Sequence, residues 1–228
     1  MGDFFQTLMK IIFPPRCICC GEIMEVSSEI ELCGRCLGEI GFSPEILPVL
    51  EYGYRNLHYC DGVLCLCGYR GILRHSIVRF KYYNKPSYHR AFARLLCRGI
   101  ALLPGTGAFD MAIGVPAYKE RERERGYNQA CLLANAFCRE TGLPDCSGLL
   151  SRIRDTGNQS RLDRGHRFRN ITGAFRVNEK EFLSGKAVLL IDDILTTGST
   201  LNECARVLKA AGAQRVYGAV IASGRKNG

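Results

Sequence analysis

Two patterns of apolar and polar positions alternate along most of this chain of 228 residues. Short runs of consecutive apolar residues are typical of strands buried on both faces, as in a parallel sheet, and occur at 63–69, 111–115, 187–191 and 215–221. Apolar residues at helical spacing occur between these runs, at 71–83, 88–103, 130–139 and 201–211. Strands that alternate with helices predict an α/β domain.

The first part of the chain lacks this alternation. Residues 4–13 predict a short amphipathic helix rather than a signal peptide, because polar residues interrupt the apolar run and two prolines follow it. Residues 37–58 are typical of a linker, with a short helix expected over 45–51. We therefore expect an N-terminal module with its linker over residues 1–58 and the α/β domain over 59–228.

Composition and charge indicate the kinds of ligand and the cellular compartment to expect for this protein. Lys and Arg total 31 against 22 Asp and Glu, a net charge of +9, which suits the phosphates of a nucleotide or a nucleic acid. A merely basic surface is the alternative. Because no apolar run is long enough to span a membrane, we expect no membrane contact. The 13 cysteines are odd in number and scattered, which predicts a reducing cytoplasm rather than a disulfide framework.

Four cysteines near the N-terminus have the spacing of a zinc site. Cys17 and Cys20 form one C-x-x-C pair, and Cys33 and Cys36 form a second. Four thiolates in this arrangement make a closed tetrahedral site, so the zinc ion should be structural. Cys19 is ambiguous, since it could replace either neighbour but breaks the spacing. The alternative is a cluster of free thiols.

The run Ala187–Ile191 leads into the most informative stretch of the chain. Asp192 and Asp193 follow it, then a loop of small and hydroxyl residues, and then a helix start. Backbone N–H groups, hydroxyls and the helix N-terminus can together hold a phosphate, which assigns this role to Thr196, Thr197, Gly198, Ser199 and Thr200. The two acids suit ribose hydroxyls and Mg²⁺.

This stretch resembles the phosphoribosyl pyrophosphate (PRPP) signature of type I phosphoribosyltransferases. The alternative is an ordinary buried strand and capped helix that carries two acids. Under the first interpretation, the predicted catalytic residues are Asp192 and Asp193.

Two further segments are rich in arginine. The charged run after strand 111–115 lies at the expected ligand edge of the sheet, which predicts a pyrophosphate contact from Arg121, Arg123 or Arg125. The long polar segment 152–170 predicts an active-site lid, which includes Arg154, Gln159, Arg161 and Arg167.

Four features in order resemble the ComF (ComFC) family of competence-associated proteins. They are the cysteine pairs, the stretch Tyr69–Tyr82, the run Arg125–Gln129 and the series from Arg154 to Phe175. The resemblance implies an N-terminal zinc ribbon and a three-layer type I phosphoribosyltransferase fold with a mostly parallel sheet. Many members carry a second set of cysteine pairs. Here only Cys60, Cys65 and Cys67 are near the first set, and Cys65 and Cys67 fall within the predicted strand 63–69.

The resemblance also implies a function. PRPP with Mg²⁺ would lose pyrophosphate as a nucleophile attacks C1 of the ribose, and the sequence leaves the acceptor open. The implied partners are single-stranded DNA and other competence proteins such as a DNA helicase. Basic and aromatic side chains lie close together in the sequence and make nucleic-acid candidates of Arg79, Lys81, Arg125 and Tyr127.

Two other functions remain open. One is a DNA-binding module that keeps the fold and binds phosphate without catalysis. The other is a nucleobase or amidophosphoribosyltransferase of nucleotide metabolism, which is disfavoured because no glutaminase domain precedes the signature domain and no cysteine follows Met1.

Overall fold

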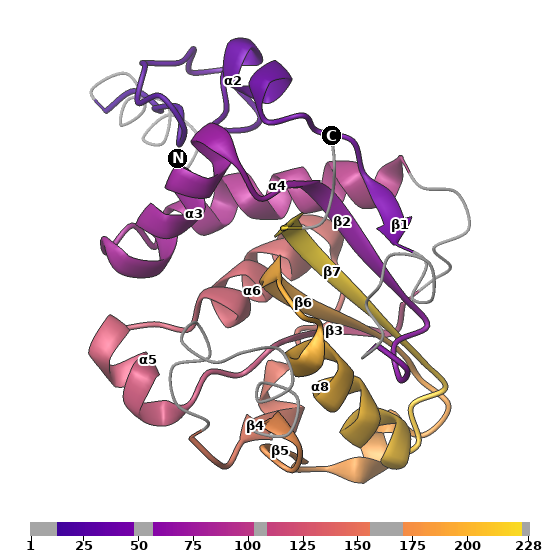
Figure 1. The fold of residues 1–228 in the computed structure, drawn as a ribbon. Helices are drawn as coiled ribbons and strands as arrows, with labels where there is room; N and C mark the ends of the chain where they lie inside the picture. The colour runs from indigo at the N-terminus through magenta and orange to yellow at the C-terminus, as the bar shows by residue number, and fades with distance from the viewer. Residues whose placement is uncertain (1–12, 48–56, 103–108, 156–170, 225–228) are drawn as a thin grey trace, which may run out of the picture.

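The computed structural model describes residues 13–47, 57–102, 109–155 and 171–224. Its centre is a five-stranded sheet in the order β1-β2-β7-β6-β3 (Figure 1). Neighbouring strands are parallel except at the β1 edge, which is antiparallel to β2. The bounds are β1 Glu45–Leu47, β2 Gly62–Gly68, β3 Met111–Gly114, β6 Ala187–Leu195 and β7 Arg215–Ser223.

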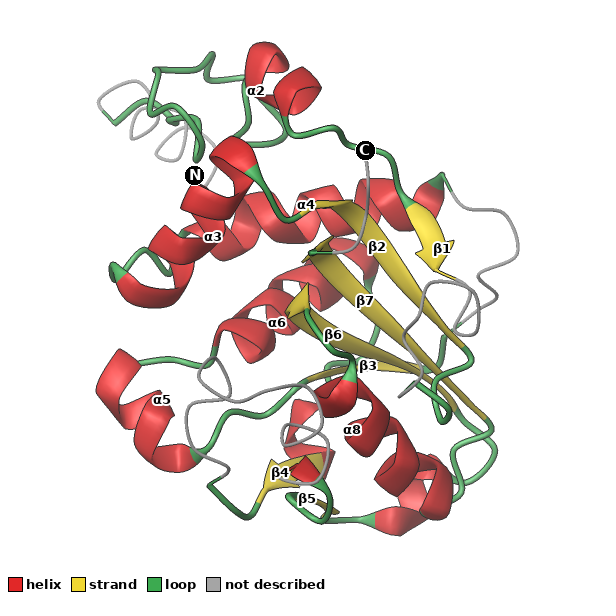
Figure 2. Cartoon of the chain, viewed as in Figure 1, coloured by secondary structure: helices red, strands yellow, loops and turns green. Residues whose placement is uncertain are grey.

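Helices cover both faces of this sheet and make three layers (Figure 2). One face packs against α3 (Gly71–Tyr82), α4 (Tyr88–Ala101) and α6 (Gln129–Thr141). The other packs against α8 (Ser199–Ala210) and the two-stranded sheet of β4 (Leu150–Arg152) and β5 (Phe175–Val177). Shorter helices are α5 (Lys119–Arg125) and the 3₁₀ turns Ser147–Leu149 and Lys180–Leu183. The predicted three-layer α/β architecture is confirmed.

Most of the predicted elements lie within a few residues of the observed ones, with two differences. Strand β6 continues to Leu195, so Asp192 and Asp193 belong to the strand itself. The helix expected over 45–51 is wrong where the structure describes it, because Glu45–Leu47 forms β1. This short strand pairs with β2, where Ile46 lies opposite Leu64, and it covers an edge that would otherwise leave backbone groups unpaired.

The N-terminal module packs directly on the helical layer. It contains α2 (Gly34–Glu39), and its buried residues Cys17, Ile18 and Leu32 share one apolar cluster with α3 and α4. Strand β1 and Leu57 precede residue 59 but pack within the α/β domain. The division at residue 58 therefore stays a prediction. Among the described residues, no helix has the length and apolar character needed to cross a membrane.

Candidate functional site

The loop between β6 and α8 has the backbone shape that the sequence predicts for a phosphate site. Gly198 is left-handed, with φ of 81°, and α8 begins at the next residue. The hydroxyls of Thr197 and Ser199 are buried and lie 3.0 Å apart. A Cβ atom on Gly198 would lie 2.7 Å from Cγ of Leu57, so a glycine is required by both conformation and space.

The acid pair lies on the last part of β6, just before this loop. Asp193 is buried, and its backbone N–H donates to Oδ1 of Asp192 at 2.8 Å. Burial and the neighbouring charge of Asp193 raise the pKa of Asp192 to about 7, although Lys81 opposes the shift. Its carboxylate can accept hydrogen bonds from ribose hydroxyls.

Lys81, from the last turn of α3, also reaches the acid pair. Its Nζ atom lies 2.9 Å from Oδ1 of Asp193, and the two side chains are only 21% and 7% exposed. Burial lowers the pKa of Lys81, but the charges of Asp193 and Asp192 outweigh this effect and raise it above its ordinary value. The sequence had suggested Lys81 only as a nucleic-acid candidate, so this contact is a finding of the structure.

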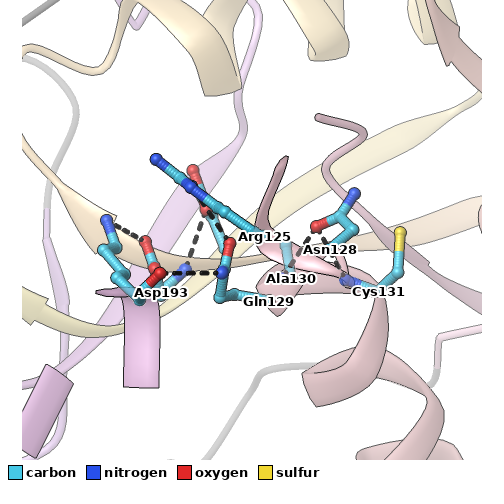
Figure 3. A network of polar contacts seen from close by, with 8 residues as sticks. Arg125, Asn128, Gln129, Ala130, Cys131 and Asp193 are labelled. Atoms are coloured by element: carbon cyan, nitrogen blue, oxygen red, sulfur yellow. Dashed lines mark hydrogen bonds and ion pairs between the residues drawn. The ribbon is translucent and has the colours of Figure 1, made fainter. Parts of the chain in front are cut away.

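The segment from Arg125 to Gln129 holds the end of α3 in place (Figure 3). Gln129 donates from Nε2 to the carbonyl oxygen of Lys81 at 3.4 Å and accepts from Nη1 of Arg125 at 3.3 Å. The hydroxyl of Tyr127 donates to the carbonyl oxygen of Phe80. These bonds occupy carbonyl groups that the end of a helix leaves without intrahelical partners.

Asn128, in the same segment, starts α6. Its Oδ1 atom accepts from the backbone N–H groups of Ala130 at 3.0 Å and Cys131 at 3.3 Å, which is the geometry of an N-cap (Figure 3). Its Nδ2 atom donates to the carbonyl oxygen of Val115, just past the end of β3. Asn128 therefore joins α6 to the end of β3.

An open groove of about 900 Å³ lies beside the acid pair, between α5 and the end of α3. It brings together the three predicted pyrophosphate residues and Lys81. Nη2 of Arg121 lies 3.5 Å from Oδ1 of Asp155, which also lines the groove. The guanidinium group of Arg125 lies 5.0 Å from the centre of the Tyr82 ring, in cation–π contact. The groove thus presents four basic side chains to a phosphate-bearing ligand, together with the acidic side chains of Glu120, Glu124 and Asp155.

The two ends of the predicted lid are bound to each other. Arg154 donates from Nη2 to the carbonyl oxygen of Thr172 at 2.6 Å. The backbone N–H of Gly173 donates to Oε1 of Glu203, on α8, at 2.7 Å. The predicted lid residues Gln159, Arg161 and Arg167 lie outside the described residues. Of the segment 152–170 the structure describes residues 152–155, and it describes the chain again from residue 171.

The four predicted zinc ligands come together in space. The Sγ atoms of Cys17, Cys20, Cys33 and Cys36 all lie within 4.8 Å of one another, with 3.8 Å between Cys20 and Cys33. Zn–S bonds of about 2.3 Å in a tetrahedron place the sulfur atoms about 3.8 Å apart, so the cluster fits a zinc ion. Within the described residues, no other group of three or more candidate ligands of this kind occurs.

The other cysteines that could have been zinc ligands lie outside the four-sulfur cluster. The Sγ atom of Cys19 lies 3.3 Å from Oγ of Ser76, outside the four-sulfur cluster. Cys60 donates to the carbonyl oxygen of Leu201, and Cys65 and Cys67 are buried within β2. The structure therefore supports the ligand set predicted from the two C-x-x-C pairs.

Comparisons with known proteins agree with this arrangement. A family model described as "Phosphoribosyl transferase domain" matches residues 148–228, and one described as "Double zinc ribbon domain" matches residues 8–47. Competence protein F of Haemophilus influenzae is 31% identical over 223 residues, which cover 91% of this chain and 96% of that protein. The chain belongs to the ComF family.

Other ComF-family relatives match a smaller part of the chain. Competence protein ComFC of Bacillus subtilis is 28% identical, over 63% of this chain and 56% of that protein. DNA utilization protein YhgH of Salmonella typhi is 31% identical, over 60% of this chain and 61% of that protein. With the parallel sheet, the matches identify a type I phosphoribosyltransferase fold behind a zinc ribbon.

For this ComF-family chain, two of the nucleic-acid candidates also make contacts within the fold. Arg79 donates from Nη2 to the carbonyl oxygens of Ile18 at 3.0 Å and Cys19 at 2.7 Å, so it holds the zinc module against α3. The half-buried ring of Tyr127 stacks on Phe80 and also lines the groove. The sequence does not show these roles, because both depend on residues brought together only by the fold.

Proposed function

We propose that this ComF-family chain binds PRPP with Mg²⁺ at the carboxyl end of β6. The 5-phosphate would lie in the loop 196–200, the ribose hydroxyls against Asp192 and Asp193, and the pyrophosphate in the groove that contains Arg121, Arg123 and Arg125. The observation that carries the proposal is the acid pair on β6. It lies between a left-handed glycine loop at a helix start and a groove whose lining includes four basic and three acidic side chains.

The proposed reaction is phosphoribosyl transfer. The bond between C1 of the ribose and the pyrophosphate oxygen breaks, pyrophosphate leaves with the electron pair, and a nucleophile forms a new bond at C1. Fixed charges favour such a step, since the acids stabilise positive charge at the ribose and the groove cations stabilise the leaving group. Bound Mg²⁺ would neutralise part of the diphosphate charge. The residues 152–170 would close over the ligand as a lid.

The test of this proposal is calorimetric titration of PRPP with Mg²⁺. Replacing both acids (Asp192→Asn with Asp193→Asn) should abolish magnesium-dependent binding without changing the circular dichroism spectrum. A matched control replaces two exposed acids, Glu179→Gln with Glu181→Gln, and should bind like the unaltered chain. A pyrophosphate-release assay with candidate acceptors tests catalysis. Equal affinity in the Asp192/Asp193 variant would contradict the assigned role.

We also propose a role in DNA handling during uptake. The support is the family, whose members include a competence protein F and a DNA utilization protein, together with a net charge of +9. Single-stranded DNA and other competence proteins, such as a DNA helicase, are the proposed partners. We place the protein in the cytoplasm, since a four-thiolate zinc site requires reduced cysteines.

Two aromatic side chains favour single-stranded DNA as the ligand. Tyr82 and Tyr83 are 62% and 66% exposed, at the end of α3 and near Lys85 and Arg125. Exposed rings beside basic residues can stack on unpaired bases. Tyr82 also lines the groove, so DNA and PRPP would meet there. We choose these two exposed residues for the test.

Fluorescence anisotropy across a salt series measures this binding. Affinity should fall as salt rises, with a log–log slope of about −0.7 per phosphate contact. Replacing Tyr82 and Tyr83 by Ala should weaken binding, by about 1–3 kcal/mol per stacked base, while Tyr59→Ala serves as the control. Because the proposed DNA and PRPP sites share the groove, PRPP should compete with single-stranded DNA for binding. Absence of binding at low salt would reject the DNA role and leave a small-molecule enzyme.

A further inference from the structure

We propose that Lys81 binds the diphosphate group of PRPP, and that Asp193 is its partner only while that group is absent. This inference rests on the proposed PRPP site and names a residue of it that lies outside the loop 196–200 and the arginine run. Lys81 comes from α3, on a different part of the chain from either of these segments. Three observations support the assignment.

The first observation is the position of Lys81 between the two halves of the site. Its ammonium group lies 2.9 Å from Asp193, the proposed ribose-binding acid. Its side chain also lines the groove that holds Arg121, Arg123 and Arg125. In PRPP the diphosphate is attached to the ribose at C1, so a cation that touches both halves lies where the two parts of the ligand join.

The second observation is the number of hydrogen bonds that Lys81 can make. An ammonium group has three donors, and one carboxylate oxygen of Asp193 occupies one of them. Within the described residues, Asp193 is the one acidic side chain in ion-pair contact with Lys81. A diphosphate offers several charged acceptor oxygens, so it can compete for this largely buried cation. Ribose hydroxyls would then satisfy the released carboxylate.

The third observation is that the backbone of Lys81 is held still. Gln129 donates to the carbonyl oxygen of Lys81, and Tyr127 donates to that of Phe80. Arg79 is bound to carbonyl oxygens of the zinc module. With the last turn of α3 fixed by these contacts, the flexible side chain of Lys81 is free to turn from Asp193 toward the groove. Because these contacts already order the backbone, ligand binding should cost little backbone conformational entropy here.

Inorganic pyrophosphate without divalent cations isolates this contact, because it has no ribose for Asp193. Calorimetry should show that Lys81→Met weakens pyrophosphate binding about ten- to 100-fold, the usual effect of one charge-assisted hydrogen bond. Asp193→Asn should keep or increase pyrophosphate affinity, since it releases Lys81 and removes a negative charge. Arg74→Met, at an exposed basic residue of α3 that does not line the groove, is the matched control and should bind normally.

The pattern across variants separates this role from a purely structural one. If Lys81 only positioned Asp193, both variants would lose PRPP affinity and neither would lose pyrophosphate affinity, which would overturn the inference. Unchanged pyrophosphate affinity in Lys81→Met would also overturn it, while PRPP binding by the unaltered chain would leave the proposed function standing. If the unaltered chain did not bind PRPP, the proposed function and this inference would fall together. Circular dichroism checks that each variant is folded.

Discussion

The ammonium group of Lys81 lies 2.9 Å from the carboxylate of Asp193, and this contact joins the end of α3 to the end of β6. Two residues earlier on the same helix, Arg79 is bound to the backbone of the zinc module. One helix therefore contacts both the zinc module and the candidate PRPP site. The sequence predicts the zinc module as a separate unit. In the structure, α3 connects this module to the candidate PRPP site of the α/β domain.

The hydrogen bonds from Arg79 to the zinc module should contribute measurably to the free energy of unfolding. Arg79→Ala leaves the carbonyl oxygens of Ile18 and Cys19 without this donor, and we expect a loss of about 1.5–3 kcal/mol in the free energy of unfolding. Arg74→Ala, on the exposed side of the same helix, should change it by less than about 0.5 kcal/mol. Denaturant titration measures both. Equal effects would show that Arg79 does not hold the module.

Gly198 should tolerate no side chain. Gly198→Ala combines a left-handed backbone, which costs about 1–2 kcal/mol, with a contact to Leu57 that adds about 1–3 kcal/mol. Gly142→Ala has the same sign of φ and open space around its Cβ, so it should show the first cost alone. Thermal unfolding compares the two variants.

A double variant separates these two costs. Because Leu57→Ala removes the side chain in the way, Gly198→Ala should cost less in its presence than in the unaltered chain. If the two substitutions were additive, Leu57 would not be what excludes a side chain from this loop.

Zinc binding should depend on the thiolate of Cys33. Cys33→Ser removes one of four thiolates and should lower the zinc content from one ion per chain to well below one, with loss of stability in the N-terminal module. Cys97→Ser, outside the cluster, should keep the metal. Atomic absorption on protein purified under reducing conditions gives the ratio. A fully folded chain without metal would contradict a structural zinc.

Glu203 should stabilise the end of the lid in a pH-dependent way. Burial would raise the pKa of Glu203, but hydrogen bonds from Arg206 and from the N–H of Gly173 outweigh it and lower the pKa below its ordinary value. A carboxyl group with a lowered folded-state pKa stabilises the protein above its unfolded-state pKa, and this stabilisation is lost as the pH falls through the folded-state value.

The variant Glu203→Gln tests this. At pH 7 it should cost about 1.5–3 kcal/mol in the free energy of unfolding, and the difference should shrink below about pH 4.5. Glu181→Gln, on the surface, serves as the control. The same cost at pH 4 and pH 7 would mean that the charge of Glu203 is not what holds Gly173.

The sequence predicts local features of this chain well. The apolar runs of β2, β3, β6 and β7 and the helical spacing of α3, α4, α6 and α8 identify these elements, because burial selects residues at fixed periods. The zinc ligands are predicted because their spacing reflects the chemistry of the metal. Strand β1 is missed, since three residues are too few to show a period.

Contacts between distant segments are not predictable from these patterns. Nothing near Lys81 in the sequence indicates Asp193, and nothing near Arg79 indicates the carbonyl oxygens of the zinc module. The position of the charged run predicts a pyrophosphate contact only from Arg121, Arg123 or Arg125. In the structure, Tyr127, Asn128 and Gln129 bind backbone groups, and Arg125 faces the groove. A sequence motif indicates that its residues are important. It does not show which of them hold the backbone in place and which contact a ligand.

A crystal structure of the chain with PRPP and Mg²⁺ tests the proposed site most directly. We predict the 5-phosphate in the loop 196–200, the ribose hydroxyls against Asp192 and Asp193, and the diphosphate in the groove with Lys81 turned away from Asp193 toward it. A structure in which PRPP binds elsewhere, or in which the loop 196–200 holds no phosphate at saturating PRPP, would contradict this account.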